Sequence, residues 1–133
     1  MDNIFNFFFR IKKYIIYEDK KIIVINKPEG LLSIPDGFQP NLPNLRDVLI
    51  SKSGSIWVVH QPDKQTSGVL IFAKDKNAHK MLNIQFQNRE IKKSYLALVH
   101  GFPLCNEKII GHPIIGDHSR KIPAVFTLSM TIF

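Results

Sequence analysis

Residues 60–68 read His60-Gln61-Pro62-Asp63-Lys64-Gln65-Thr66-Ser67-Gly68. This polar stretch lies between two apolar runs, residues 55–59 and 69–73, which are predicted strands because they are rich in β-branched and aromatic side chains. Pro62 fixes the backbone directly before Asp63, and polar groups between two strands meet solvent or a ligand. The stretch is predicted to hold the Asp63 carboxylate rigidly, and a plain turn between two strands is the alternative.

The rest of the chain alternates strands and helices without a regular βαβ rhythm. Further strands are predicted at residues 21–26 and 94–99, and helices are predicted after the capping residues Asn44 and Asp75. The first helix has an apolar face of Leu45, Val48 and Leu49, and Ser53-Gly54 is predicted to end it. The second has a stripe of Ala78, Met81, Leu82, Gln85 and Phe86. This pattern predicts an α+β fold with a mixed, mainly antiparallel sheet and flanking helices.

Composition narrows the class of protein. The 133 residues suit one domain, 44% of them are hydrophobic, and a net charge of +7 with a pI near 9.6 favours a nucleic-acid partner. The single cysteine, Cys105, cannot form an internal disulfide, so nothing indicates an oxidising compartment. No stretch approaches the roughly 20 apolar residues that span a bilayer. We expect a cytoplasmic protein without a membrane partner.

Residues 26–32, 60–70 and 93–101 form three motifs that together resemble those of the RluA-type RNA pseudouridine synthases. Residues 60–70 are similar to the family's His-Arg-Leu-Asp, two variable residues, Thr-Ser-Gly and an apolar strand. Residues 26–32, Asn-Lys-Pro-Glu-Gly-Leu-Leu, resemble its first motif, Asn-Lys-Pro-x-Gly. Residues 93–101, Lys-Ser-Tyr-Leu-Ala-Leu-Val-His-Gly, resemble its Lys-x-Tyr-x-Ala-x-Val-x-Gly strand. The motifs occur in the family's order, and weaker similarity extends the resemblance to residues 15–126.

The resemblance implies an enzyme that isomerises uridine to pseudouridine in ribosomal or transfer RNA, with Asp63 as the catalytic residue. It implies no metal or other cofactor, and we expect a monomer. The implied substrate-binding residues are Tyr95, His60, Gln61, Thr66, Ser67 and Gly68. The implied RNA contacts are Lys27, Lys92 and Lys93. The alternative to the substrate-binding role of Tyr95 is a strand aromatic in the core. The alternative to the RNA contacts is that these lysines lie on a solvated surface.

The resemblance also predicts how the chain is divided into segments, and the sequence differs from the family pattern in two places. It predicts an N-terminal extension at residues 1–14, a partial catalytic domain at residues 15–126, and an aberrant tail at residues 127–133. Gln61 stands where the family has an arginine. A glutamine lacks the permanent charge and the forked donor geometry of a guanidinium. The later family motif Thr-Gly-Arg-x-His-Gln-Ile-Arg-x-His has no counterpart in this sequence. We therefore expect a truncated catalytic domain.

Three other interpretations compete with an active enzyme. The first is a catalytically inactive RNA-binding remnant, which Gln61 and the missing motif favour. The second is a synthase of the neighbouring RsuA type, which usually has Gly-Arg-Leu-Asp and an N-terminal RNA-binding module. The third is a metal site, although the spacing of its ligands matches no standard zinc pattern. Its ligands would be His100, Cys105, His112 and His118.

Overall fold

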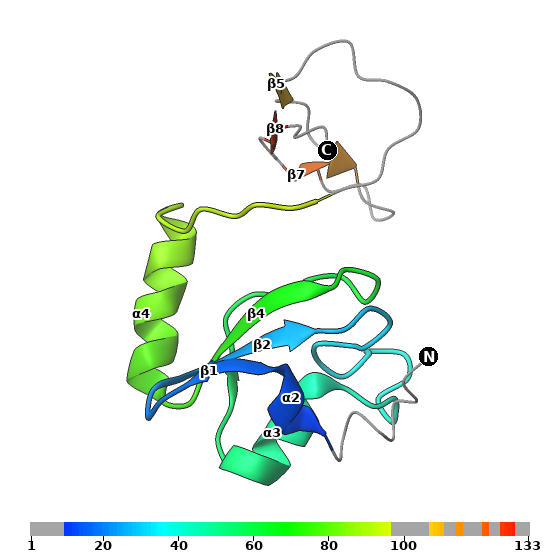
Figure 1. The fold of residues 1–133 in the computed structure, drawn as a ribbon, viewed down its shortest axis with the longest axis vertical. Helices are drawn as coiled ribbons and strands as arrows, with labels where there is room; N and C mark the ends of the chain where they lie inside the picture. Colours follow the sequence, from blue (N-terminus) through cyan, green and yellow to red (C-terminus); the bar gives the residue numbers. More distant parts are fainter. Residues whose placement is uncertain (1–9, 97–106, 111–113, 116–120, 123–125, 130–133) are drawn as a thin grey trace. The chain divides into compact units, whose positions relative to one another are not determined.

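The computed structural model describes residues 10–96 and the backbone of four later strands at residues 107–110, 114–115, 121–122 and 126–129 (Figure 1). The chain divides between Lys93 and Ser94 into two compact units, and each unit is described by itself. The elements of the first unit are α2 (Ile11–Tyr14), β1 (Ile15–Glu18), β2 (Ile22–Lys27), α3 (Leu45–Ser53), β3 (Trp57–Val58), β4 (Gly68–Ala73) and α4 (Lys76–Gln87).

The first unit is built on a four-stranded sheet with the order β1-β2-β4-β3 (Figure 1). All three neighbouring pairs are antiparallel. Strands β2 and β4 pair along their whole length, from Ile22 opposite Ala73 to Lys27 opposite Gly68. The predicted α+β class with a mainly antiparallel sheet is confirmed.

The hydrophobic core lies against one face of this sheet. Ile23 and Ile25 of β2 and Leu70 and Phe72 of β4 are all 0% exposed, because alternate residues of a strand point to the same face. The apolar face of α3 packs against them, together with Ile11 of α2. Each such fully buried side chain contributes about 1.5–3 kcal/mol to folding. The sheet that carries the candidate site is therefore held by a core of its own.

Helix α3 begins and ends as the sequence predicts. The Asn44 side chain accepts a hydrogen bond from the backbone N–H of Asp47 at 3.0 Å, and its amide donates to the Asp47 carboxylate at 2.8 Å. Gly54 ends the helix with a φ of +80° and donates to the Ile50 carbonyl at 2.9 Å. Such an N-cap stabilises a helix by about 1 kcal/mol. The three residues of the predicted apolar face are all buried.

Helix α4 is capped by Asp75 as predicted, and its predicted apolar stripe is confirmed except at Met81. Ala78 of that stripe is buried and Leu82, Gln85 and Phe86 are half-buried, whereas Met81 is 59% exposed. The helix contacts β3 and β4 instead of entering the core cluster. It meets them through His79, which bonds to the Val58 carbonyl, and Phe86, which stacks on His60. The contacting face therefore includes the polar ring of His79 beside the apolar side chains of the predicted stripe.

Three other segments differ from the sequence-based predictions. The predicted strand at residues 55–59 is shorter, since β3 spans Trp57–Val58. Helix α2 lies within the predicted N-terminal extension, and its Ile11 is 7% exposed in the core cluster. Ser94, Tyr95 and Leu96 are not in a strand, and the remainder of that predicted strand lies outside the described residues.

The second unit contains two strand pairs in its described part. Strands β5 (Glu107–Ile110) and β8 (Phe126–Ser129) are antiparallel, with Ile110 opposite Phe126. Strands β6 (Ile114–Ile115) and β7 (Lys121–Ile122) form the other antiparallel pair. The first residues of the predicted aberrant tail are thus part of a strand, β8.

Candidate active site

The segment that contains Asp63 leaves the sheet beside the end of β2. Gly68 opens β4 directly opposite Lys27, the last residue of β2. Its φ is +121°, in a region that favours glycine. The loop before β4 and the loop after β2 therefore leave the sheet at the same end and lie next to each other. Asp63 belongs to the first loop and Gly30 to the second.

Lys27 joins these two loops from inside the protein. The residue is only 1% exposed, although it carries an ammonium group. Its Nζ donates to the carbonyls of Pro28 at 3.1 Å, Leu31 at 2.9 Å and Lys64 at 3.0 Å. An ammonium has three donors, so each of the three has an acceptor. The Lys27 ammonium therefore fixes the loop after β2 to the residue that follows Asp63.

The charge of Lys27 is balanced by nearby carboxylates. Burial lowers its pKa below the ordinary value of 10.5, because desolvation disfavours the charged form. The negative charges of Asp63 and Glu29 act in the opposite direction and raise the pKa of Lys27. The Asp63 carboxylate therefore stabilises the buried cation that holds its own loop. This position does not favour the predicted RNA contact of Lys27, since its ammonium does not face solvent.

The backbone around Asp63 is anchored at three consecutive carbonyl groups. The Pro62 carbonyl accepts from the Ser33 hydroxyl at 3.3 Å, and the Asp63 carbonyl accepts from the Thr66 N–H at 3.0 Å. The Lys64 carbonyl accepts from the Gly30 N–H at 3.0 Å, in addition to the Lys27 ammonium. The Asp63 side chain itself is exposed. The site thus presents one carboxylate to solvent from a fixed backbone, as a catalytic group requires.

His60 contributes to the site as a support. Its Nε2 accepts a hydrogen bond from the Ile71 N–H of β4 at 3.2 Å. His60 lies two residues after Val58, where the pairing of β3 with β4 ends. Its ring stacks on Phe86 of α4, with 4.9 Å between ring centroids and an interplanar angle of 22°. The Lys93 Nζ lies 4.7 Å from the centre of the same phenyl ring. His60 therefore joins β4 and α4 at the start of the Asp63 loop.

We predict that His60 makes stability depend on pH. Burial first, and the charge of Lys93 second, lower its pKa below 6.5. The unfolded chain then takes up a proton before the folded chain does, so stability is full above about pH 6.5 and declines as pH falls through the folded pKa. Gln in place of His60 keeps an acceptor near Nε2 without titrating. Urea midpoints measured between about pH 8 and pH 5 should fall more steeply in the wild type than in His60→Gln, and parallel curves would contradict this.

The other predicted site residues lie in several environments. Gln61 and Ser67 are exposed, and Thr66 is half-buried beside Asp63. Lys92 is exposed on the segment after α4, beside Lys93. Tyr95 is 67% exposed and belongs to the second unit. Among these residues, the structure brings Thr66 into direct contact with Asp63.

Two supporting residues were missed by the sequence analysis. Ser33 is 3% exposed, and its hydroxyl holds the residue before Asp63. Phe86 was predicted on the stripe of α4, but its contact with His60 was not. Neither residue gives a local signal, since a serine in a proline-rich loop and a phenylalanine in an amphipathic helix are common. Both roles depend on contacts between distant parts of the chain.

The described part of the chain contains neither a cluster of metal ligands nor a candidate membrane span. Within residues 10–96, no three His, Cys, Asp or Glu side chains are grouped so that they could hold a metal ion. The four alternative metal ligands lie outside the part of the chain that is described. None of the described helices has the length and apolarity needed to cross a membrane.

Comparison with known proteins supplies the family. Residues 21–125 match the family model for RNA pseudouridylate synthase. The dual-specificity RNA pseudouridine synthase RluA of Yersinia pestis is 39% identical over 107 residues, which cover 80% of this chain and 52% of that protein. The protein of the same name from Escherichia coli (strain K12) is 38% identical over 107 residues, which cover 80% of this chain and 49% of that protein.

A solved structure supports the fold. The human RNA pseudouridylate synthase domain containing 4 has a TM-score of 0.67 with this chain at 22% identity, over 90% of this chain and 52% of that one. The chain spans about half the length of the curated relatives it matches. The family match covers most of the chain, from the start of β2 onward, and it includes the loop of Asp63. The chain therefore belongs to the RNA pseudouridylate synthase family.

Proposed function

We propose that this chain isomerises uridine to pseudouridine in RNA, with Asp63 as the catalytic carboxylate. The observation that carries the proposal is the anchoring of the Pro62, Asp63 and Lys64 carbonyls, which leaves the Asp63 side chain facing solvent. Such an arrangement fixes a reactive group without covering it. Preorganisation of this kind is what a site needs in order to favour a transition state.

The proposed reaction needs no external reactant. The bond from ribose C1′ to uracil N1 breaks, the base rotates, and a new bond forms from C1′ to carbon 5. The proton of carbon 5 leaves and N1 gains one, so the product is an isomer and atoms and electrons balance. A carboxylate can attack the sugar or remove the proton, and both roles require Asp63 in its charged form. This chemistry calls for neither a metal nor a redox cofactor.

The proposed substrate is a uridine in ribosomal or transfer RNA. The net charge of +7 suits a polyanion, and Lys92 and Lys93 are exposed cations that follow α4. Extrusion of the target base from its stack costs a few kcal/mol. Gln61 and Ser67 are exposed in the loop of Asp63 and are proposed to face the extruded base. A stacking role on the base is proposed for Tyr95 from its match to the family motif alone. We further propose that the protein works as a monomer in the cytoplasm.

A second candidate function is RNA binding without isomerisation. The observation that favours it is Gln61, which stands next to the catalytic loop where the family motif has an arginine. Glutamine keeps hydrogen-bonding groups but lacks the permanent charge and the forked geometry of a guanidinium. The charge pattern of the chain suits this function equally well.

Tritium release decides between the two functions. RNA labelled with tritium at carbon 5 of uracil is incubated with the purified chain, and the label released to water is counted. We expect release in proportion to enzyme, together with pseudouridine in the digested RNA. RNA binding by the folded chain without any release would contradict the isomerase proposal and support the second function. Gln61→Arg is a useful companion, since a gain in release would assign a role to that position.

A further inference from the structure

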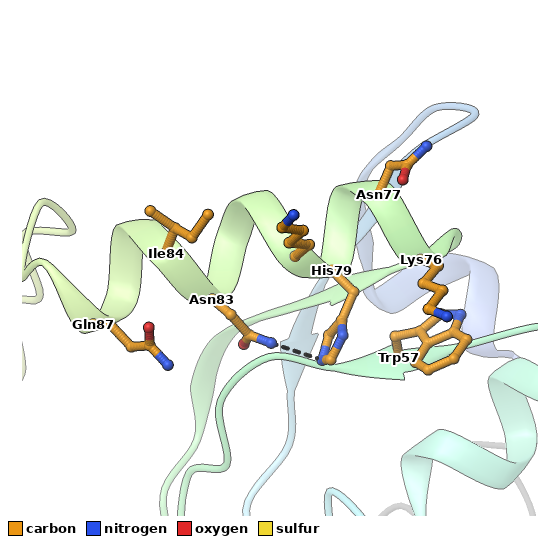
Figure 2. Close-up of a pocket in the computed structure, with 8 residues that line it drawn as sticks. Trp57, Lys76, Asn77, His79, Asn83, Ile84 and Gln87 are labelled. Carbon is orange, nitrogen blue, oxygen red and sulfur yellow. Dashed lines mark hydrogen bonds between the residues drawn. The ribbon is translucent and has the colours of Figure 1, made fainter.

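A groove on the first unit lies outside the proposed active site. It runs along α4 beside the edge strand β3 and has a volume of about 420 Å³ (Figure 2). Two elements that are separate in sequence, β3 and α4, form its walls. Its lining residues are Trp57, Lys76, Asn77, His79, Lys80, Asn83, Ile84 and Gln87. None of the three carbonyl anchors of Asp63 involves any of them.

His79 holds the two walls of the groove together. Its Nε2 lies 2.9 Å from the carbonyl oxygen of Val58 on the edge strand, so Nε2–H donates to that carbonyl. The Asn83 amide lies 3.0 Å from the same nitrogen (Figure 2). The His79 ring also packs against Trp57, with 5.3 Å between centroids and an interplanar angle of 34°. The indole is therefore fixed before any ligand arrives.

Trp57 remains accessible in spite of these contacts. The side chain is on a strand at the edge of the sheet, and 38% of the residue is exposed. A large aromatic surface left to water is unusual for a structural tryptophan, whereas an indole held in place and open is suited to stacking on a planar ligand. Ile84 at the same groove is 40% exposed and adds apolar surface.

The charge of the groove selects an anionic ligand. Lys76 and Lys80 are exposed, and no aspartate or glutamate is among the lining residues. Lys76, His79, Asn83 and Gln87 recur at helical spacing and share one face of α4. From Lys76 to Gln87 the helix rises by about 16 Å, which is longer than one nucleotide. The groove thus combines a stacking surface, amide groups for base edges, and cations for phosphates.

We propose that this groove binds a single-stranded segment of the RNA substrate, with a base stacked on Trp57 and phosphates beside Lys76 and Lys80. Asn83 and Gln87 offer amide donors and acceptors to the base. This inference rests on the proposed function for the identity of the ligand, and it adds a second contact away from the target uridine. Stacking combined with backbone charge is tolerant of sequence, so the groove would increase affinity more than specificity.

The chain provides its own probe for this groove. Trp57 is the only tryptophan in the sequence, so tryptophan fluorescence reports on the groove alone. A short oligouridylate with a terminal dye is titrated with the full chain, and dye anisotropy gives total RNA binding. The unlabelled oligonucleotide is then added to the chain while Trp57 emission is followed. We expect saturable quenching with the same midpoint as the anisotropy.

Two variants with equal loss of charge make the test specific. Lys76→Ala/Lys80→Ala removes two cations from the groove, and Lys20→Ala/Lys21→Ala removes two exposed cations from the turn between β1 and β2. The groove variant should bind more weakly than the control and reduce the slope of log affinity against log salt by about 1.4, as expected for two phosphates of a single strand. Trp57→Ala should weaken binding by about 5- to 150-fold, with circular dichroism to verify the fold.

Each outcome separates the groove from the proposed function. RNA binding by anisotropy without a change in Trp57 emission, and with equal affinities for the two lysine pairs, would overturn the groove inference and leave the isomerase proposal standing. Absence of any RNA binding by the folded chain would overturn both the groove inference and the isomerase proposal. Quenching by inorganic polyphosphate as strong as that by oligouridylate would reduce the groove to an anion site and overturn nucleotide binding. An emission change that follows protein concentration alone, with a doubled mass in sedimentation, would assign the groove to a second copy of the chain.

Discussion

Asp63→Asn is expected to abolish tritium release from labelled RNA while the protein remains folded. The substitution replaces a carboxylate oxygen with an amide nitrogen of nearly equal size, so shape is conserved and charge is lost. A neutral amide can neither attack the sugar nor accept a proton. The loss of a nucleophile or general base lowers a rate by about a thousandfold or more. The remaining release should lie at the background of the assay.

The fold should tolerate this change because Asp63 is held by its backbone. Its carbonyl accepts from the Thr66 N–H and its side chain is exposed, so the stabilisation that is lost is the attraction between its charge and the Lys27 ammonium, which should cost about 1 kcal/mol or less. Glu29→Gln is the matched control. Glu29 is also exposed, and its charge acts on the same buried Lys27. The control removes the same charge from the same neighbourhood without touching the proposed catalytic group.

Tritium release from Asp63→Asn and from Glu29→Gln together tests whether the Asp63 carboxylate is catalytic. Normal release from Glu29→Gln together with none from Asp63→Asn would assign catalysis to the Asp63 carboxylate. Equal losses in both would mean that the local charge around Lys27 matters and that Asp63 has no separate role. Normal release from folded Asp63→Asn would contradict the assignment. RNA affinity should be similar in both variants, since neither removes a positive charge.

Local signals predicted much of the fold. Asn44 and Gly54 mark the two ends of α3 because capping and left-handed dihedral angles depend on a few neighbouring residues. The β-branched run before Lys27 predicts β2 for the same reason. The contact of His79 with the edge strand was not predictable, because it depends on where the Val58 carbonyl lies after folding. No property of the helix alone specifies that partner.

Lys27 shows which part of the site the sequence could have revealed. Ile23, Ile25 and Lys27 alternate along β2, and the first two point into the core, so strand periodicity places Lys27 on the same buried face. The resemblance to the family, and not this periodicity, led to the prediction of an RNA contact for Lys27. The three carbonyl acceptors could not be inferred, since Lys64 is 37 residues away in the chain. Asp63 itself was identified by its motif.

Lys27→Met is the second change with a large expected effect. Methionine has nearly the same length and packs well in a buried position, but it offers no donor to the carbonyls of Pro28, Leu31 and Lys64. Removal of the buried charge relieves its desolvation, which offsets part of the loss. The carbonyls left without a donor each cost about 1–3 kcal/mol, so we expect a net destabilisation of about 2 kcal/mol.

The rate of tritium release should fall by more than the loss of folding stability explains, because the ammonium of Lys27 no longer connects the loop of Asp63 to the loop after β2. A small displacement of a catalytic group lowers a rate by about a hundredfold. Amide hydrogen exchange should accelerate at Gly30 and Thr66, whose N–H groups bond to the loop carbonyls. Lys64→Met is the matched control, since it removes an exposed lysine from the same loop and keeps the Lys64 carbonyl. Unchanged exchange and unchanged tritium release in a folded Lys27→Met protein would show that the Asp63 loop is held without the ammonium, through the Ser33 and Gly30 contacts alone.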